Sequence, residues 1–216
     1  MPWSIEQRNA AVDAVFAQAP VLPVIVIDKL DDAVPLARAL VAGGLPVLEV
    51  TLRSPVALEA MRRIAAEVDG AVLGAGTVLS PADLEAAAAA GCTFAISPGA
   101  TADLYRAADA SPIVWLPAVA TASEVMQGLA HGHQRFKFFP AVSSGGIPAL
   151  KGFSGPFPQV RFCPTGGIDA GSAPAFLALP NVGTVGGSWM LPKDAVSAGD
   201  WARVEALARE AAALRA

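Results

Sequence analysis

The 216-residue sequence is poor in charge and in cysteine, and each shortage excludes a class of protein. Charged residues make up 16% of the chain, the formal net charge is −4, and no block of like charges occurs. Nucleic acid is therefore not an expected partner, and neither is an anionic membrane. The two cysteines, Cys92 and Cys163, lie within apolar runs. This placement favours buried thiols in a reduced, intracellular protein over a disulfide framework.

Segments that could direct secretion or cross a membrane are also missing. The N-terminal stretch carries Glu6, Arg8 and Asp13, where a signal peptide needs apolar residues. The longest charge-free run, 170–192, is interrupted by prolines and glycines and cannot form a spanning helix. We therefore expect a soluble, cytoplasmic protein without a membrane partner.

What the sequence does contain is 54% hydrophobic residues, arranged as short apolar runs between helical stretches. Such runs are typical of buried strands in a parallel sheet, because these strands are apolar on both faces. Eight of them occur, at 24–27, 47–50, 71–74, 93–96, 113–116, 135–138, 160–163 and 182–185.

Signals for helix starts lie between these runs. Ser54-Pro55 and Ser80-Pro81 each place an N-cap serine before a proline at the first helical position. Thr121 and Glu124 have the spacing of a capping box. Each predicted strand is thus followed by a predicted helix.

Eight such strand–helix units in about 190 residues predict a compact (β/α)8 barrel, the TIM-barrel fold. We expect one domain over residues 1–216, with an extra N-terminal helix at 4–18. A doubly wound open sheet is the alternative, but no G-x-G-x-x-G motif follows the first strand.

The active site of such a barrel lies in the loops after the strands. His131 and His133 fall at the opposite face and have no third ligand nearby, so they predict a surface loop and no metal site. Four charged residues follow the first strand at the correct face, where helix capping explains the aspartates as well as function does: Asp28, Lys29, Asp31 and Asp32.

Two charged residues, Glu49 and Lys137, lie inside predicted strands. Alternation turns Lys137 away from Phe136 and Phe138, so the lysine enters the barrel while the phenylalanines pack under the helices. Glu49 points inward in the same way. The two strands are the second and sixth of eight, so the carboxylate and the amine can meet at the mouth of the barrel.

This pair is either a structural ion pair or a reactive amine with its proton partner. A buried ion pair usually gains little over an apolar pair. Desolvation, or a nearby cation such as Arg53, lowers the pKa of a lysine and frees its amine as a nucleophile. Of four lysines, only Lys137 lies on a strand pointing into the barrel, which favours the reactive amine.

Glycine pairs follow the last two strands, in CPTGGI at 163–168 and GGSWM at 186–190. Glycines there let backbone N–H groups approach an anion, and barrels often bind phosphate after strands seven and eight. The two loops together predict a phosphate site.

With these residues in place, the sequence resembles the class I 2-keto-3-deoxy-6-phosphogluconate aldolases, a family that overlaps with 4-hydroxy-2-oxoglutarate aldolase. The likeness runs nearly end to end. It is strongest in GLPVLEVTLR and GHQRFKFFPAVSSG, which match the two active-site signatures of the family, and in GAGTVL, FAISPG, VRFCPTGGI and GGSW.

The resemblance implies a Schiff base at Lys137 and a general acid/base role for Glu49. The other implied residues divide among parts of the substrate: Arg53 and Thr77 at the carboxylate, Pro98 and Phe139 at the pyruvyl portion, Thr165 at the sugar hydroxyls, and Gly166, Gly167, Gly187 and Ser188 at the phosphate. It also implies a small phosphorylated 2-keto acid as substrate, no metal or other cofactor, and a homotrimer. Pyruvate and glyceraldehyde 3-phosphate would be the products, as in the Entner-Doudoroff pathway.

Three other interpretations stay open. A related aldolase could prefer unphosphorylated 4-hydroxy-2-oxoglutarate or another 2-keto-3-deoxy sugar acid. A phosphate-barrel isomerase could use the lysine only as an acid. A phosphometabolite-binding barrel could lack catalysis altogether, although intact Glu49, Lys137 and Arg53 oppose this last case.

One departure from the family is Ala118, where a glycine is expected, and its methyl group can shift the fifth-strand loop.

Overall fold

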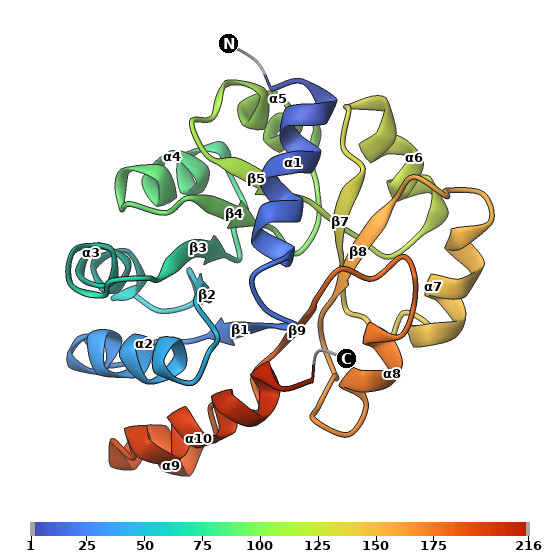
Figure 1. Cartoon of the computed structure of the whole chain (residues 1–216). Coiled ribbons are helices and arrows are strands. Elements are labelled where there is room, and N and C mark those ends of the chain that lie inside the picture. The colour runs from blue at the N-terminus through green and yellow to red at the C-terminus, as the bar shows by residue number, and fades with distance from the viewer. Residues whose placement is uncertain (1–2, 215–216) are drawn as a thin grey trace.

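Parallel strands alternate with helices through most of the computed structural model, which describes residues 3–214. The strands are β1 Val21–Ile25, β2 Val47–Thr51, β3 Val72–Gly76, β4 Phe94–Ile96, β5 Val114–Leu116, β6 Ala118–Val119, β7 Arg135–Phe138, β8 Arg161–Pro164 and β9 Val185–Gly187. The helices are α1 Ile5–Phe16, α2 Ala33–Ala42, α3 Ala57–Glu67, α4 Pro81–Ala89, α5 Ala102–Ala110, α6 Ala122–Ala130, α7 Gly146–Ser154, α8 Ala173–Leu177, α9 Lys193–Ala198 and α10 Trp201–Ala212. Helices α2 to α8 lie around the outside of the strands, and α1 lies across them (Figure 1).

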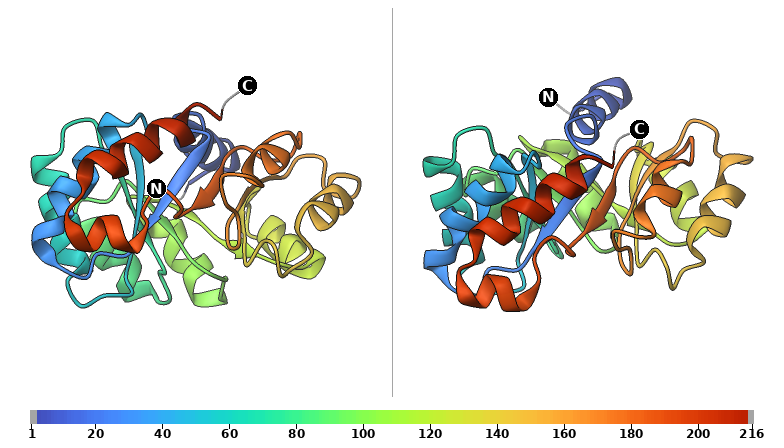
Figure 2. Two further views of the ribbon diagram at one scale, coloured as in Figure 1. Left: turned by 90° about the horizontal axis from the view of Figure 1, so that it is seen from below. Right: turned by 60° about the horizontal axis from the view of Figure 1, so that its bottom comes forward.

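All eight predicted strands overlap observed ones, and the run 135–138 has the predicted bounds. The last strand begins at Val185, where 182 was expected. The predicted N-terminal helix is α1, and at the other end α10 packs against α2 (Figure 2). Within residues 3–214, no helix is both long enough and apolar enough to cross a bilayer. The outermost residues of the expected 1–216 domain lie outside the described residues.

The strands pair in two parallel sheets, ordered β5-β4-β3-β2-β1-β9 and β6-β7-β8. Between β5 and β6 stands Pro117, whose nitrogen cannot donate to a ladder. Strands β8 and β9 meet through isolated bridges, at Phe162–Val182 and Thr165–Gly186. The predicted α/β fold with a curled parallel sheet is therefore confirmed. A full (β/α)8 barrel is not, because the described residues do not form one continuous eight-stranded ladder.

The predicted helix starts are correct in two cases out of three. Ser80 and Thr121 cap α4 and α6, each in a capping box. The prediction for Ser54 is wrong, because its hydroxyl donates to the carbonyl of Ile27 at 2.6 Å and α3 begins only at Ala57. Ser54 therefore joins the loops that follow β1 and β2 instead of capping a helix.

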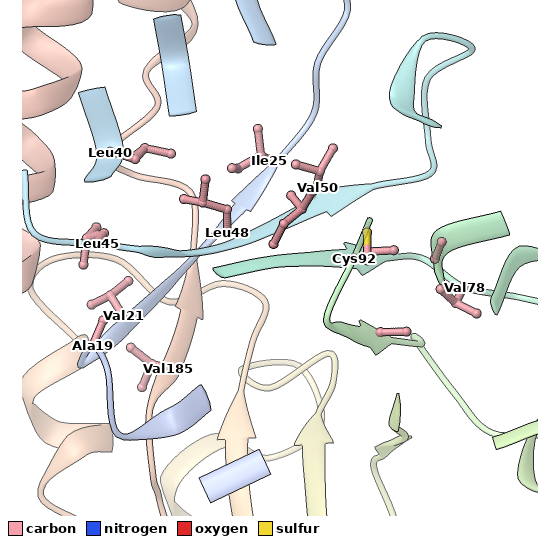
Figure 3. Close-up of a cluster of buried hydrophobic side chains, with 14 of the residues drawn as sticks. Ala19, Val21, Ile25, Leu40, Leu45, Leu48, Val50, Val78, Cys92 and Val185 are labelled. Carbon is pink, nitrogen blue, oxygen red and sulfur yellow. The ribbon is translucent and has the colours of Figure 1, made fainter. Parts of the chain in front are cut away.

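Side chains at alternate positions along the strands belong to two separate apolar clusters. The larger one lies between the strands and the helices and includes Leu48, Val50, Phe136 and Phe138. Figure 3 shows part of this cluster, with Leu48 and Val50 on β2 near Ile25 of β1. The predicted outward direction of both phenylalanines is thus confirmed.

The smaller cluster fills the space that the strands enclose. It contains Leu22, Val47 and Cys163 from three strands, together with Val12 and Phe16 from α1. Helix α1 therefore contributes its apolar side to the interior and closes it at one end.

Polar contacts hold α1 in this position. Trp3 Nε1 donates to the carbonyl of Ser111 at 2.9 Å. Arg135 donates from Nε and Nη2 to the two carboxylate oxygens of Asp13, at 2.6 and 2.7 Å. Because Arg135 is the first residue of β7, the closed end is the N-terminal end of the strands.

His133 takes part in the same docking and is not a surface residue, so the prediction for it is wrong. It is 3% exposed, and Arg8 of α1 donates to its Nε2 at 2.7 Å. Arg8 also pairs with Asp109 and donates to the carbonyl of His131. A guanidinium can only donate, so Nε2 accepts and the ring of His133 is neutral. Sequence spacing gave no sign of this, since Arg8 and His133 are 125 positions apart.

Burial first, and then the Arg8 cation, lower the pKa of His133 from 6.5 to about 3. The unfolded chain therefore binds a proton here more tightly than the folded chain, so this residue stabilises the fold above pH 6.5 and the contribution is lost as the pH falls toward 3.

We expect the unfolding free energy, measured in urea at pH 7 and pH 4.5, to fall more in the wild type than in His133→Gln. Glutamine offers an acceptor oxygen to Arg8 but does not titrate. The exposed His131→Gln is the matched control and should keep the wild-type pH dependence. Identical pH dependence in the His133→Gln variant would contradict the assignment.

Candidate active site

A buried carboxylate and a buried amine face each other inside the curled sheet. Lys137 Nζ lies 2.9 Å from Glu49 Oε1 and 3.3 Å from Oε2. The Lys137 side chain is 6% exposed and that of Glu49 is 2% exposed. The predicted meeting of these side chains across the interior is confirmed. In so dry a place each charge depends on the other for compensation.

The Glu49–Lys137 pair lies next to the apolar interior, on its side toward the C-terminal ends of the strands. On β2, inward positions run from Val47 in the inner cluster to Glu49 and then Thr51. On the other side, Lys137 is the register partner of Cys163, another member of that cluster. The interior below the pair is therefore filled with apolar side chains and closed by α1, so the open direction is toward the C-terminal ends of the strands.

Cys163 is the nucleophilic group next to Lys137 along the sheet. Burial raises the pKa of its thiol to about 12, and the Lys137 cation offsets this only in part. A thiol with such a pKa stays protonated at neutral pH and is a poor nucleophile. The amine of Lys137 is therefore the better candidate for covalent chemistry.

Gly76, which the sequence analysis overlooked, provides the space for the Glu49 carboxylate. A Cβ atom at this position would lie 2.4 Å from Glu49 Oε1, far inside van der Waals contact. Glycine at the end of β3 is thus required for the observed position of Glu49. The next residue, Thr77, has a φ of 61°, an uncommon left-handed conformation for a residue with a branched side chain. Such conformations cluster at functional sites, and Thr77 is one of the predicted carboxylate-binding residues.

Phe139, which directly follows β7, lies beside the Lys137 amine. The Lys137 ammonium is 5.4 Å from the centre of the Phe139 ring. Gly166 packs close to the same segment, because a Cβ there would lie 3.3 Å from Pro140 Cα and 3.4 Å from the Phe139 ring. Pro98 is half-buried in the loop after β4.

The residues predicted for the far end of the substrate lie on β8, β9 and their loops. Thr165 is the bridge partner of Gly186, and a Cβ on Gly186 would lie 2.2 Å from the Thr165 hydroxyl. Gly186 therefore makes room for Thr165 as Gly76 does for Glu49, and this role was also missed. Gly187 ends β9, and Ser188 follows it as an exposed residue.

The loop glycines Gly166 and Gly167 have φ angles of 103° and 79°. Both values lie in the region that favours glycine, so side chains at these positions would strain the turn. Consecutive residues of this kind expose backbone N–H groups, which is the property needed for an anion.

Arg53 continues the row of inward positions on β2 beyond Thr51. Its Nε donates to the Thr51 hydroxyl at 3.2 Å, and that hydroxyl donates to the carbonyl of Ile25 at 2.8 Å. Arg53 and Ser188 line one cleft of about 420 Å³, which opens among the loops after β1, β2 and β9. The structure therefore brings a cation and a hydroxyl to one cleft at the C-terminal ends of the strands. Among residues 3–214, no cluster of three or more His, Cys, Asp or Glu side chains could hold a metal ion.

Comparison with known proteins agrees with this arrangement. The family model for KDPG and KHG aldolases matches residues 12–207. The 2-dehydro-3-deoxy-phosphogluconate aldolase of Pseudomonas aeruginosa is 52% identical over 208 residues, which cover 96% of this chain and 94% of that protein.

Two solved structures are also similar to the chain. A KDPG aldolase from Legionella pneumophila, with pyruvate captured as a covalent carbinolamine, has a TM-score of 0.91 and 50% identity, over 93% of this chain and 97% of its own. A 2-keto-3-deoxy-6-phosphogluconate aldolase from Zymomonas mobilis, with 3-phosphoglycerate, has a TM-score of 0.90 and 54% identity, over 94% of this chain and 96% of its own.

The buried pair makes a testable prediction about stability. Lys137→Met leaves the Glu49 carboxylate without a partner in the interior, which should lower the unfolding free energy by about 3–5 kcal/mol. Replacing both residues, with Glu49→Leu and Lys137→Met, should restore the wild-type value or exceed it, because no charge remains to be desolvated.

Urea unfolding at pH 7 measures these changes. The exposed pair Arg62–Glu59, 3.0 Å apart, is the matched control, and Glu59→Ala should change the free energy by less than about 1 kcal/mol. A double variant as unstable as Lys137→Met would show that the pair is a net stabilising contact.

Proposed function

Because the chain belongs to the KDPG and KHG aldolase family, we propose that it is a class I aldolase that cleaves 2-keto-3-deoxy-6-phosphogluconate to pyruvate and glyceraldehyde 3-phosphate. The observation that carries the proposal is the Lys137 amine, held 2.9 Å from the Glu49 carboxylate in a closed apolar interior. The amine is the nucleophile, and the carboxylate moves every proton of the cycle.

The reaction starts with a proton transfer within the pair. When the ammonium gives its proton to Glu49, two opposite charges become a neutral amine and a carboxylic acid, which a dry interior tolerates at lower cost. The amine then attacks the C2 ketone of the substrate. Glu49 shuttles protons from nitrogen to oxygen to give the carbinolamine, and then protonates its hydroxyl, which leaves as water.

The resulting iminium accepts the electrons that cleavage of the C3–C4 bond releases. Glu49, now a carboxylate, takes the proton of the C4 hydroxyl. The electrons of the C3–C4 bond move into the iminium and form an enamine, while the C4 fragment leaves as an aldehyde. Glu49 next protonates C3 of the enamine, and water then hydrolyses the iminium to release pyruvate and the free amine.

The surrounding residues hold the substrate along this path. We assign its carboxylate to Arg53 and Thr77, and its pyruvyl portion to Pro98 and Phe139. Phe139 lies against the Lys137 ammonium, which supports this placement. Thr165 faces the sugar hydroxyls of the substrate in this assignment.

The phosphate is assigned to the two loops after β8 and β9. The left-handed turns at Gly166 and Gly167, and the exposed Ser188 after Gly187, support this position. Binding energy from this remote group is available in the transition state and accelerates the cleavage.

Cleavage of unphosphorylated 4-hydroxy-2-oxoglutarate is the second candidate activity. The matching family model covers both substrates, and the steps at C2, C3 and C4 are the same for each. The two substrates differ from C5 onward, where one carries a hydroxyl and a phosphate and the other a carboxylate. Thr165 and the phosphate loops would therefore distinguish them, and the two activities compete at one site.

Several finer properties follow the family. We propose that the two sheets act as a single (β/α)8 barrel, joined at the Phe162–Val182 and Thr165–Gly186 bridges, in one domain of residues 1–216. We also propose a cytoplasmic homotrimer. The exposed apolar side chains Leu79, Met126 and Val142 support burial between subunits.

Trapping the covalent intermediate tests the proposed activity directly. Pyruvate with borohydride should inactivate the enzyme, because reduction of the iminium leaves a stable secondary amine on Lys137. Mass spectrometry of the digested protein should locate the added mass on the peptide that contains Lys137. Labelling of Lys29, Lys151 or Lys193 in its place would refute the assignment.

Replacing Glu49, the proposed proton acceptor, should lower the turnover rate. Glu49→Gln preserves the shape of the side chain but cannot accept a proton, so kcat should fall by about 10²–10⁴. Steady-state kinetics with the phosphorylated substrate measures this change, and Glu59→Gln on the exposed face of α3 is the control. Near-normal turnover of Glu49→Gln would remove Glu49 from the mechanism.

A further inference from the structure

The cleft that Arg53 and Ser188 line extends beyond the residues assigned so far. Its floor is the inward row of β1: Val24 is the register partner of Glu49, Val26 is 38% exposed at the mouth, and Asp28 follows on the rim. The cleft therefore begins level with Glu49 and leads outward along β1.

The chain after β9 forms the opposite wall. Gly187 pairs with Pro23 of β1, and Ser188 and Leu191 then line the cleft. Lys193, the first residue of α9, lines the same cleft. The predicted phosphate loop therefore runs directly into a wall that carries a cation.

The Lys193 ammonium is available for an outside anion. It is exposed, and it makes no ion pair or hydrogen bond with a residue in the described part of the chain. The adjacent acid, Asp194, is instead engaged by Arg203 at 2.6 Å. The cation is therefore not neutralised by its own helix.

The charges along the cleft match a substrate with an anion at each end. Arg53 stands on the side of β2 and Lys193 on the side of α9, and both line the cleft. Asp28 on the rim carries the opposite charge and has no partner among residues 3–214. An approaching phosphate is thus attracted by one unpaired side chain and repelled by another.

We propose that Lys193 is a specificity-determining residue that binds the phosphate of the aldehyde half, and that Asp28 weakens the same interaction. This inference rests on the proposed function and adds a side-chain cation to a phosphate site otherwise built from glycines and Ser188. If this assignment holds, the charges of Lys193 and Asp28 together set the preference for phosphorylated over unphosphorylated substrates.

The test compares two substrates in charge variants of the rim. Lys193→Gln should lower kcat/KM for 2-keto-3-deoxy-6-phosphogluconate about tenfold, the size of one charge-assisted contact that is partly screened by water. Asp28→Asn should raise the same value about two- to fivefold, because it removes a repulsive charge near the site. Both variants should change kcat/KM for 4-hydroxy-2-oxoglutarate less, by about twofold at most, because its terminal C5 carboxylate carries one charge and stops short of the phosphate position.

Lys29→Gln is the matched control. Lys29 is also an exposed lysine, but it lines only the neighbouring hollow, which Asp28 shares, so its removal should change kcat/KM for the phosphorylated substrate much less than Lys193→Gln does. Equal effects of Lys193→Gln and Lys29→Gln, or equal losses on both substrates, would overturn the inference.

Failure of the inference differs from failure of the proposed function. Pyruvate and borohydride should label Lys137 in Lys193→Gln as fully as in the wild type. Normal labelling together with wild-type substrate preference would reject the role of Lys193 alone. Absence of labelling in the wild type would reject the aldolase itself.

Discussion

The ion pair between Lys137 and Glu49 is the constraint on which the rest of the structure depends. Two charges at almost complete burial are costly to desolvate, and they persist only where the surroundings hold them at short distance. Gly76 leaves the space for the carboxylate, and Phe139 presents its ring to the ammonium. The fold thus keeps in place an arrangement that an apolar pair could replace at lower energetic cost, which is typical of a site selected for chemistry.

Closure of the interior by α1, at the N-terminal ends of the strands, determines from which side the amine can be reached. With Val12 and Phe16 of α1 in the interior, the space below the pair is apolar and shut, so substrate and water reach the amine only from the C-terminal ends of the strands. The residues that we assign to different parts of the substrate are then spread over separate loops at that face. This separation allows recognition to vary without disturbing the pair.

Alternation along short strands was sufficient to predict the centre of the site. It gave the inward directions of Glu49 and Lys137 and the outward directions of Phe136 and Phe138, because a period of two residues leaves each side chain only two directions. Local signals also predicted the caps at Ser80 and Thr121. The errors arose where the partner is distant in sequence. The carbonyl of Ile27 accepts a hydrogen bond from Ser54, and Arg8 contacts the buried His133. Gly76 and Gly186 were missed for the same reason, since what they make room for belongs to other strands.

The docking of α1 has a consequence for how the chain reaches its native state. This helix leaves the ribosome before the strands of the fold, yet one of its anchors comes much later: Asp13 and Arg135 are 122 positions apart. At a synthesis rate of about 5–20 residues per second, the helix waits roughly 6–25 seconds before its partner strand exists. Throughout that interval the Asp13–Arg135 ion pair cannot form, although apolar partners such as Phe94 and Val114 are made earlier. Contacts so distant in sequence form slowly even afterwards. The segment that finally excludes water from the reactive amine is therefore one of the last to find its place, and the nascent chain is open to solvent until then.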